Sequence, residues 1–238
     1  MKKAAALVNC RIGKLDQKRC DLICRVADEI YAGKLSEHFP LVVWQTGSGT
    51  QSNMNVNEVI ANRGNELAGE PLLHPNDHVN MSQSSNDTFP TAMHIAARLA
   101  VHHNLLPALT SLIDTFQCLE YQNRGIVKSG RTHLQDATPI AFSQEISGWR
   151  ASLQEDKKML IAALREVSSL ALGGTAVGTG LNAPKEFGAM TAQMLSEMTG
   201  LAFRSAENKF HALTSKGELV FLHGALKALA ADLWKIAN

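Results

Sequence analysis

The chain has 238 residues, of which 45% are hydrophobic and 19% are charged, and its formal net charge is +1. These values are ordinary for a globular protein of one or two domains with a buried core. Because the lysines and arginines are scattered and only 5% of the residues are aromatic, the composition argues against a nucleic-acid partner. The sequence shows no recognisable secretory signal and no apolar run long enough for a membrane span, so we expect no membrane partner either.

The cysteines show neither metal-binding nor CxxC spacing. Cys20 and Cys24 fall one helical turn apart, but no second pair completes a metal site, so burial on a helix face is the better interpretation. With Cys10 and Cys118 they are interpreted as free thiols. We therefore expect a cytoplasmic protein, because that compartment keeps thiols reduced.

Helical periodicity dominates the first part of the chain. Apolar residues recur at spacings of three and four over residues 15–32, and residues 2–9 show the same pattern. A short apolar run at 39–44 leads to a helix that should continue to about residue 68. The chain opens directly in a helix, so we expect that the N-terminus of the complete fold lies upstream.

Long helices are predicted in the rest of the chain. Pro107 should kink or divide the helical stretch over 93–122. The helices predicted over 139–170 and 212–238 carry apolar residues on more than one edge, which is typical of helices that pack against several others, often across subunits. A shorter helix should begin at Pro184 and end near Gly200.

Two polar turns precede helices in the first half of the chain. The first contains GSGT, in which the glycines free the backbone to curl and the hydroxyls supply neutral donors, although a lone GSG run more often marks a flexible loop. The second is SSND at residues 84–87, a donor cluster too polar for a core, with a helix expected to start over residues 88–90.

A third polar turn, GRTHLQDATP at residues 130–139, places Thr132 beside His133. Thr138 is expected as a helix N-cap and Pro139 as the first helical residue, so nearby amides should point outward and suit an anion. His133 is able to move a proton near neutral pH. For an isolated Thr-His pair a capping or packing histidine would be the better interpretation, but the two other polar turns shift the balance towards a site.

Two further patterns do not favour a metal or a nucleotide. His74 and His78 are four residues apart, but Pro75 should disrupt the helix that would align them, so no metal site is expected. The glycine-rich stretch over 172–188 has neither a preceding strand nor a GK[ST] motif, so it is interpreted as a mobile loop or crossover rather than a nucleotide site.

Taken together and in this order, GSGTQSNMN, HPND, SSND and GRTHLQDATP closely resemble the class II fumarate hydratases. This family lies within the superfamily that also holds aspartate ammonia-lyase, argininosuccinate lyase and adenylosuccinate lyase. The stretches GGTAVGTGLN and HGALKALAADLWKIAN belong to the same resemblance, which covers nearly the whole chain. The GSGT and SSND turns and His133 favour fumarase over aspartase. The resemblance implies reversible hydration of fumarate to L-malate, without a metal or an organic cofactor.

The resemblance also assigns roles to residues of the three turns. His133 would be the catalytic histidine. A dianionic substrate and the aci-carboxylate formed when a carbon-bound proton is lost both need several fixed donors, which neutral hydroxyls and amides provide. The residues that would bind the substrate are Ser48, Gly49, Thr50, Ser84, Ser85, Asn86 and Thr132.

A second dicarboxylate site near the entrance is implied at the HPND turn. The preceding segment, residues 71–73, is shorter than in family members and lacks their usual basic residue, which sets this site apart from the family pattern. The residues concerned are His74, Pro75, Asn76 and Asp77.

The fold implied by the resemblance is a mainly α, fumarase/aspartase-like long-helix bundle that is incomplete here. Residues 1–87 would be part of the N-terminal domain and 88–238 the first half of the central helical domain of a homotetramer. The family's Gly-Ser-Ser loop, with the serine regarded as the carbon-acid base, would lie beyond Asn238, so we expect a chain truncated at both ends and inactive by itself. Two alternatives stay open: an aspartase-like ammonia-lyase, and a non-catalytic helical fragment that binds only dicarboxylates or partner subunits.

Overall fold

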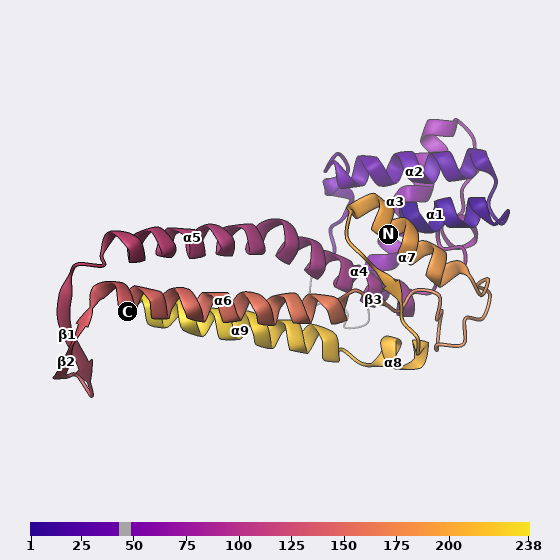
Figure 1. Cartoon of the computed structure of the whole chain (residues 1–238). Coiled ribbons are helices and arrows are strands. Elements are labelled where there is room, and N and C mark those ends of the chain that lie inside the picture. The colour runs from indigo at the N-terminus through magenta and orange to yellow at the C-terminus, as the bar shows by residue number, and fades with distance from the viewer. Residues whose placement is uncertain (43–48) are drawn as a thin grey trace. The chain divides into compact units, whose positions relative to one another are not determined.

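The computed structural model describes residues 1–42 and 49–238 and is mainly helical, which confirms the expected fold class (Figure 1). It contains two compact units. The first consists of Met1–Ile95 and Ser168–Ser215, and the second of Ala96–Val167 and Lys216–Asn238. These units differ from the expected ranges 1–87 and 88–238, because the segment after residue 167 packs with the N-terminal part of the chain. None of the helices within the described ranges is both long and apolar enough to cross a membrane.

Helices form the N-terminal part of the first unit, and their periodic apolar faces share one core around Ile23, Val26 and Ile60. Asp16 starts α2, because its side chain accepts a hydrogen bond from the Arg19 amide at 3.0 Å. The helices expected at 2–9 and 15–32, and the end expected near residue 68, are confirmed with slightly shifted ends. The bounds are α1 Lys2–Arg11, α2 Gln17–Tyr31, η1 Ser36–His38, α3 Thr50–Ala68, η2 Pro75–Val79 and α4 Ser85–Ala100.

The chain returns to the first unit after residue 167. A two-residue strand, β3, pairs in parallel with β4, and the glycine-rich loop follows β3. The expectation that no strand precedes this loop is therefore wrong. The helix end expected near Gly200 is confirmed, since Gly200 adopts a left-handed conformation after the last residue, but the start expected at Pro184 was wrong because the helix begins at Phe187. The bounds are β3 Ser169–Leu170, α7 Phe187–Thr199, β4 Arg204–Ser205 and α8 Lys209–Thr214.

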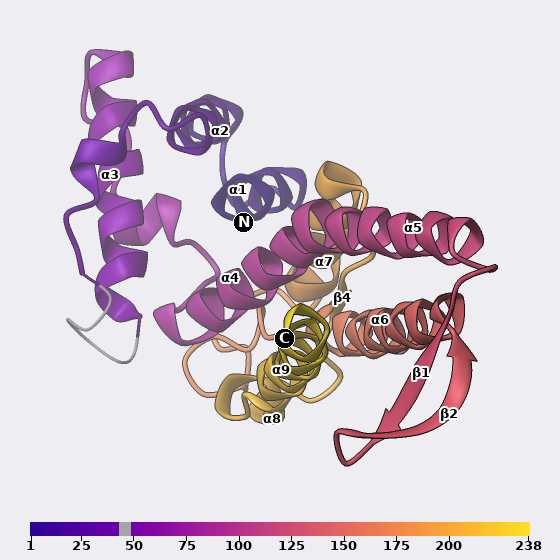
Figure 2. The ribbon, with the colours of Figure 1, turned by 90° about the vertical axis from the view of Figure 1, so that its left-hand side faces the viewer.

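Three long helices, α5, α6 and α9, run side by side in the second unit (Figure 2). Their shared core includes Leu109, Leu153, Leu160 and Leu229. The expected break near Pro107 is confirmed: the π-helical turn η3 precedes α5, and Pro107 lies in the first turn of α5, where its missing N–H costs little. The bounds are η3 Val101–Leu105, α5 Leu106–Gln122, α6 Phe142–Val167 and α9 Gly217–Ala237. The expectation of a single helix over 212–238 was wrong, because α8 ends at Thr214 before α9 begins.

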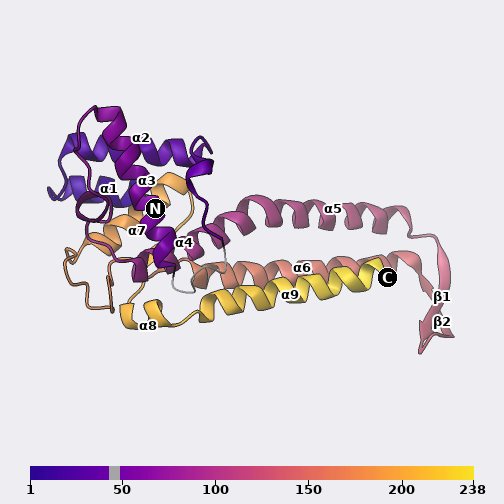
Figure 3. The same cartoon turned by 180° about the vertical axis from the view of Figure 1, so that it is seen from behind.

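A β-hairpin joins α5 to α6 where a helix start was expected (Figure 3). Strand β1 (Val127–Thr132) pairs antiparallel with β2 (Gln135–Ala141), so Gly130 faces Thr138 and Thr132 faces Gln135. The helix N-cap expected at Thr138 and the helical start expected at Pro139 are therefore wrong, and α6 begins at Phe142. The cross-strand hydrogen bonds satisfy backbone groups that a helix would otherwise have satisfied, and Thr, Val and Ile suit strands.

Candidate active site

The first polar turn leads into α3. Ser48 lies outside the described residues. Gly49 precedes the helix with φ of +75°, and a Cβ at this position would overlap the Phe89 ring, so only glycine fits here without strain. Thr50 is the first residue of α3 and is exposed. The start of α3 therefore lies directly against the first turns of α4.

The second polar turn forms the N-terminus of α4. The helix begins at Ser85, so the start expected over residues 88–90 was wrong and the SSND residues are themselves its first turn. The Ser84 hydroxyl accepts from the Asn86 amide at 3.2 Å, and Asn86 Nδ2 donates to the Ala176 carbonyl at 2.8 Å. From α3, Asn53 Nδ2 donates to the Ser85 hydroxyl at 2.8 Å. Asn53 thus fixes the two helix starts together.

Asp87, the last residue of the SSND turn, is fully buried and holds the turn to the glycine-rich loop. Its Oδ1 accepts from the Ser84 amide at 2.9 Å, and its Oδ2 accepts from the Gly173 and Thr175 amides, each at 2.9 Å. Burial raises the pKa of Asp87, while the three amide donors and the charge of Lys2 act in the opposite direction. No local sequence pattern indicates this role, because the loop partners of Asp87 are remote in the chain.

Two lysines interact electrostatically with the carboxylate of Asp87. Lys2 Nζ donates to Asn80 Oδ1 and Gln83 Oε1, both at 2.9 Å, and burial lowers the pKa of Lys2 to about 7 although Asp87 opposes the shift. Lys209 Nζ donates to the Leu170 carbonyl at 2.9 Å and to a nearby serine hydroxyl, and burial lowers its pKa to about 8, again against the effect of Asp87. Neither lysine carries a sequence signal, since each acquires its environment through tertiary contacts.

The third polar turn belongs to the second unit and lies on the hairpin. Thr132 is the last residue of β1, His133 and Leu134 form the connecting turn, and all three are exposed. His133 and Leu134 have φ values of 48° and 63°, as a tight two-residue hairpin connection requires. The imidazole of His133 is therefore exposed to solvent within its own unit. This exposed position in a hairpin turn does not support a packing or helix-capping role for His133.

The HPND turn folds as a single π-helical turn, η2, in the first unit. Pro75 occupies its first position and His74 before it is extended, so His74 and His78 do not share one helix, as expected. His74 Nδ1 accepts from the Asp77 amide at 3.3 Å, and His78 Nδ1 accepts from the His74 amide at 2.9 Å. These bonds occupy one ring nitrogen, Nδ1, of each histidine. Within residues 1–42 and 49–238, no cluster of three or more His, Cys, Asp or Glu side chains is arranged to hold a metal ion.

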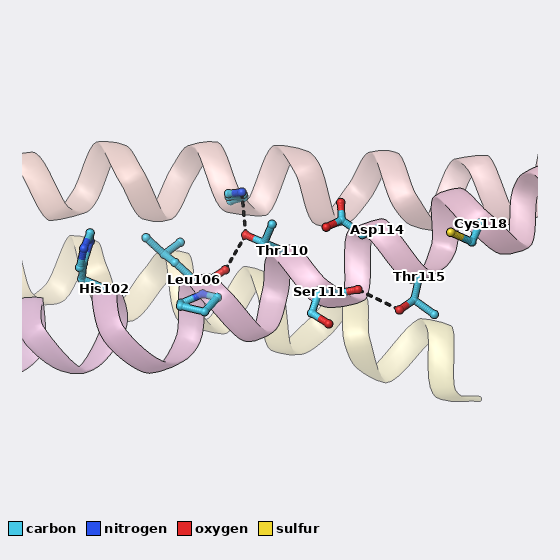
Figure 4. A pocket seen from close by; sticks show the side chains of 9 residues that line it. His102, Leu106, Thr110, Ser111, Asp114, Thr115 and Cys118 are labelled. Carbon is cyan, nitrogen blue, oxygen red and sulfur yellow. Dashed lines mark hydrogen bonds between the residues drawn. The ribbon is translucent and has the colours of Figure 1, made fainter.

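A shallow pocket of about 800 Å³ lies along α5 in the second unit (Figure 4). Lys157 reaches into it from α6 and donates to the Thr110 hydroxyl at 2.8 Å. His102 of η3 and Asp114 and Cys118 of α5 also line it. None of the described residues from the polar turns contributes to this pocket, so it is not the candidate active site.

The match to a known protein family shows which family this chain belongs to. The family described as Lyase matches residues 1–238, the whole chain. The chain belongs to this lyase family. The resemblance to the class II fumarate hydratases is confirmed within it by the relatives described next.

Similar members of the lyase family are class II fumarate hydratases. The chain is 59% identical to the class II fumarate hydratase of Bacillus anthracis and 55% identical to that of Bacillus subtilis, in both cases over 100% of this chain and 52% of the relative. It matches the crystal structure of class II fumarase from Schistosoma mansoni with a TM-score of 0.98 and 40% identity, over 100% of this chain and 54% of that one. The chain thus spans about half the length of the curated relatives it matches.

Proposed function

We propose that the protein to which this chain contributes catalyses the reversible hydration of fumarate to L-malate. The observation that carries the proposal is the joining of two donor-rich helix starts, since Asn53 of α3 bonds Ser85 of α4 at 2.8 Å and Gly49 lies against Phe89. The names of relatives at 55–59% identity support the same activity.

The neutral donors suit a dicarboxylate. Ser48, Gly49 and Thr50 would bind one part of the carboxylate pair and Ser84, Ser85 and Asn86 another, as hydroxyls, amides and helix N-termini do for anions without adding a full charge. In the dehydration direction a base removes a proton from carbon, leaving an aci-carboxylate whose extra charge these donors stabilise. Thr132 would hold the substrate beside the reacting atoms.

His133 would transfer the proton that balances the step. In dehydration the hydroxyl group leaves as water after it gains a proton, and in hydration an attacking water loses one. An imidazole exchanges protons near neutral pH, and the exposed hairpin turn leaves the His133 ring accessible to substrate. His74, Pro75, Asn76 and Asp77 would form a second dicarboxylate site, to which the exposed His74 and Asp77 side chains supply the polar groups.

The assembly and compartment are part of the same proposal. We propose a homotetramer, because α5, α6 and α9 leave large apolar side chains exposed, and a cytoplasmic location, because the four cysteines are free thiols. No metal or organic cofactor is part of the proposed reaction. The sequence contains no Gly-Ser-Ser stretch, so we expect the 238-residue chain to be inactive by itself.

The test uses a chimera in which this chain replaces the matching half of the Bacillus anthracis relative, here called the completed protein. Loss of fumarate ultraviolet absorbance should occur in water alone, with L-malate as the product. Turnover that appears only when ammonium is added would show an aspartase-like ammonia-lyase instead. A folded completed protein without turnover in either buffer would favour the third possibility, a non-catalytic helical fragment.

A further inference from the structure

The buried carboxylate of Asp87 connects two segments that lie far apart in the sequence. It accepts three backbone hydrogen bonds, one from Ser84 in the SSND turn and two from Gly173 and Thr175 in the glycine-rich loop, 86 and 88 residues further along the chain. This set of four residues is called the Asp87 clip below. Because both carboxylate oxygens are occupied, the side chain fixes the loop and the turn relative to each other.

The glycine-rich loop packs closely against its neighbours, so the residues of the Asp87 clip have little room to move. Gly173 has φ of +97°, and a Cβ on it would approach the Gly188 Cα of α7 to 2.9 Å. Beside the clip, the Leu172 amide donates to the buried Thr91 hydroxyl of α4 at 3.0 Å. The loop is therefore fastened to α4 at two successive points, of which only the Asp87 clip also includes the SSND turn.

The clip also controls the side chains that face solvent. Asn86, which directly precedes Asp87, donates its Nδ2 to the Ala176 carbonyl at 2.8 Å, one residue beyond Thr175. Ser84 is fixed through its backbone amide, and its hydroxyl in turn accepts from the Asn86 amide. Displacement of the loop would consequently rotate both Ser84 and Asn86 away from their present orientation.

Charge balance explains why a carboxylate is tolerated in a fully buried position. Three amide dipoles converge on it, and Lys2 and Lys209 act on it as the neighbouring cations. These donors and charges offset part of the cost of burial, which still raises the pKa of Asp87. A neutral amide would offer only one acceptor oxygen and would turn an NH₂ group towards backbone N–H donors.

We propose that Asp87 is a positioning residue, which orients Ser84 and Asn86 for substrate binding by clipping the SSND turn to the glycine-rich loop. The inference rests on the proposed function for its kinetic consequence, but the clip itself is a property of the chain. Asp87 touches no substrate in this proposal and acts only through the residues that do.

Hydrogen–deuterium exchange on the completed protein, read at single amides by mass spectrometry with fragmentation, tests the clip. In the unsubstituted chain the Ser84, Gly173 and Thr175 amides should be protected. Asp87→Asn should accelerate exchange on at least one side of the clip by about tenfold or more, the effect of losing a hydrogen bond to a charged acceptor. The matched control, Thr91→Val, has nearly the same shape and removes only the neighbouring bond, so it should accelerate Leu172 and leave Ser84 protected.

Kinetics of the completed protein test the positioning role. Asp87→Asn should raise KM for fumarate about tenfold or more and change kcat less, because misplaced donors weaken binding of the ground state and the transition state alike. Thr91→Val should change KM by less than about twofold, and the melting temperatures of both variants should be measured on the same preparations.

Three results would overturn the inference. The clip would be contradicted by fast exchange of the Ser84, Gly173 and Thr175 amides in the unsubstituted chain. This result does not depend on whether Asp87→Asn folds. An Asp87→Asn protein with a lower melting temperature but an unchanged KM would make Asp87 purely structural. Equal KM changes in the two variants would assign the effect to loop anchoring in general. If the unsubstituted completed protein lacks activity, the proposed function fails, and the kinetic role of Asp87 fails with it. Hydrogen–deuterium exchange still shows whether the Asp87 clip exists.

Discussion

At the scale of single residues, the hairpin turn determines what a change at His133 can do. The residue is exposed with φ of 48°, a left-handed conformation that asparagine adopts more readily than most residues. His133→Asn should therefore leave the melting temperature of the completed protein unchanged while lowering kcat by about 10²–10⁴, the usual contribution of a proton-transfer group. Activity and thermal unfolding measured on one preparation check this, and a stable variant with near-parental kcat would remove His133 from the catalytic residues.

Thr132, its neighbour at the end of β1, should respond differently. A hydroxyl that holds the substrate carboxylate in both the ground state and the transition state contributes uniform binding. Thr132→Ala should thus raise KM at least as much as it lowers kcat, by about tenfold for one hydrogen bond to a charged group. Steady-state kinetics of the completed protein decide this, and a pure kcat effect with unchanged KM would be inconsistent with a binding role.

At the scale of elements, the packing of α6 on α9 contains an unfavourable carboxylate. Asp156 is 1% exposed beside the apolar core of the second unit, and its Oδ2 finds no hydrogen-bond partner among the described residues. Burial, followed by the charge of Asp232 on α9 and a hydrogen bond shared with it, raises the pKa of Asp156. The ionised form of Asp156 is therefore disfavoured at this helix contact.

The sign of the pH dependence follows from this raised pKa. Below the ordinary carboxyl pKa both the folded and the unfolded chain are protonated, so the group has no effect on the free energy of unfolding. As pH rises from the ordinary to the raised pKa, the unfolded chain loses its proton first, and the free energy of unfolding falls. The penalty is fully present above the raised pKa.

Asp156→Asn should therefore stabilise the chain at pH 8 by about 1 kcal/mol or more, since an amide removes the repulsion and donates to Asp232. The stabilisation should shrink towards pH 4. Urea unfolding of the parent and the variant at several pH values measures this, with Asp114→Asn, an exposed change on α5, as the control. A variant less stable than the parent at pH 8 would show that the carboxylate has a stabilising partner.

At the scale of the whole molecule, the exposed apolar side chains of the second unit predict association. On α9, Trp234 is 74% exposed and Val220 67%, and on α5 Tyr121 is 70% exposed. Side chains of this size are usually covered in helical assemblies, which supports the proposed homotetramer. Light scattering of the 238-residue chain should show oligomers or aggregates, and Trp234→Lys should shift the distribution to smaller species. A soluble monomer with a cooperative melt would contradict this prediction.

Much of the fold follows from local patterns in the sequence. Periodic apolar residues placed α1, α2 and α3, Pro107 marked the break before α5, and Gly200 marked the end of α7. These signals act over one or two helical turns, so they need no knowledge of the rest of the chain. The motifs of the polar turns likewise sufficed for the family, since their order along the chain is itself a property of the sequence.

Tertiary structure alone decided the hairpin and the Asp87 clip. Thr138 and Pro139 suit a helix start as well as a strand, and only pairing with residues 127–132 selects the strand. Asp87 looks like one more donor of a polar turn until Gly173 and Thr175 are brought to its carboxylate from 86 and 88 residues away. The sequence by itself determined most of the helices and the family, whereas strand pairing in the hairpin determined where His133 lies, and the contacts of Asp87 with a distant loop determined what holds Ser84 and Asn86 in place.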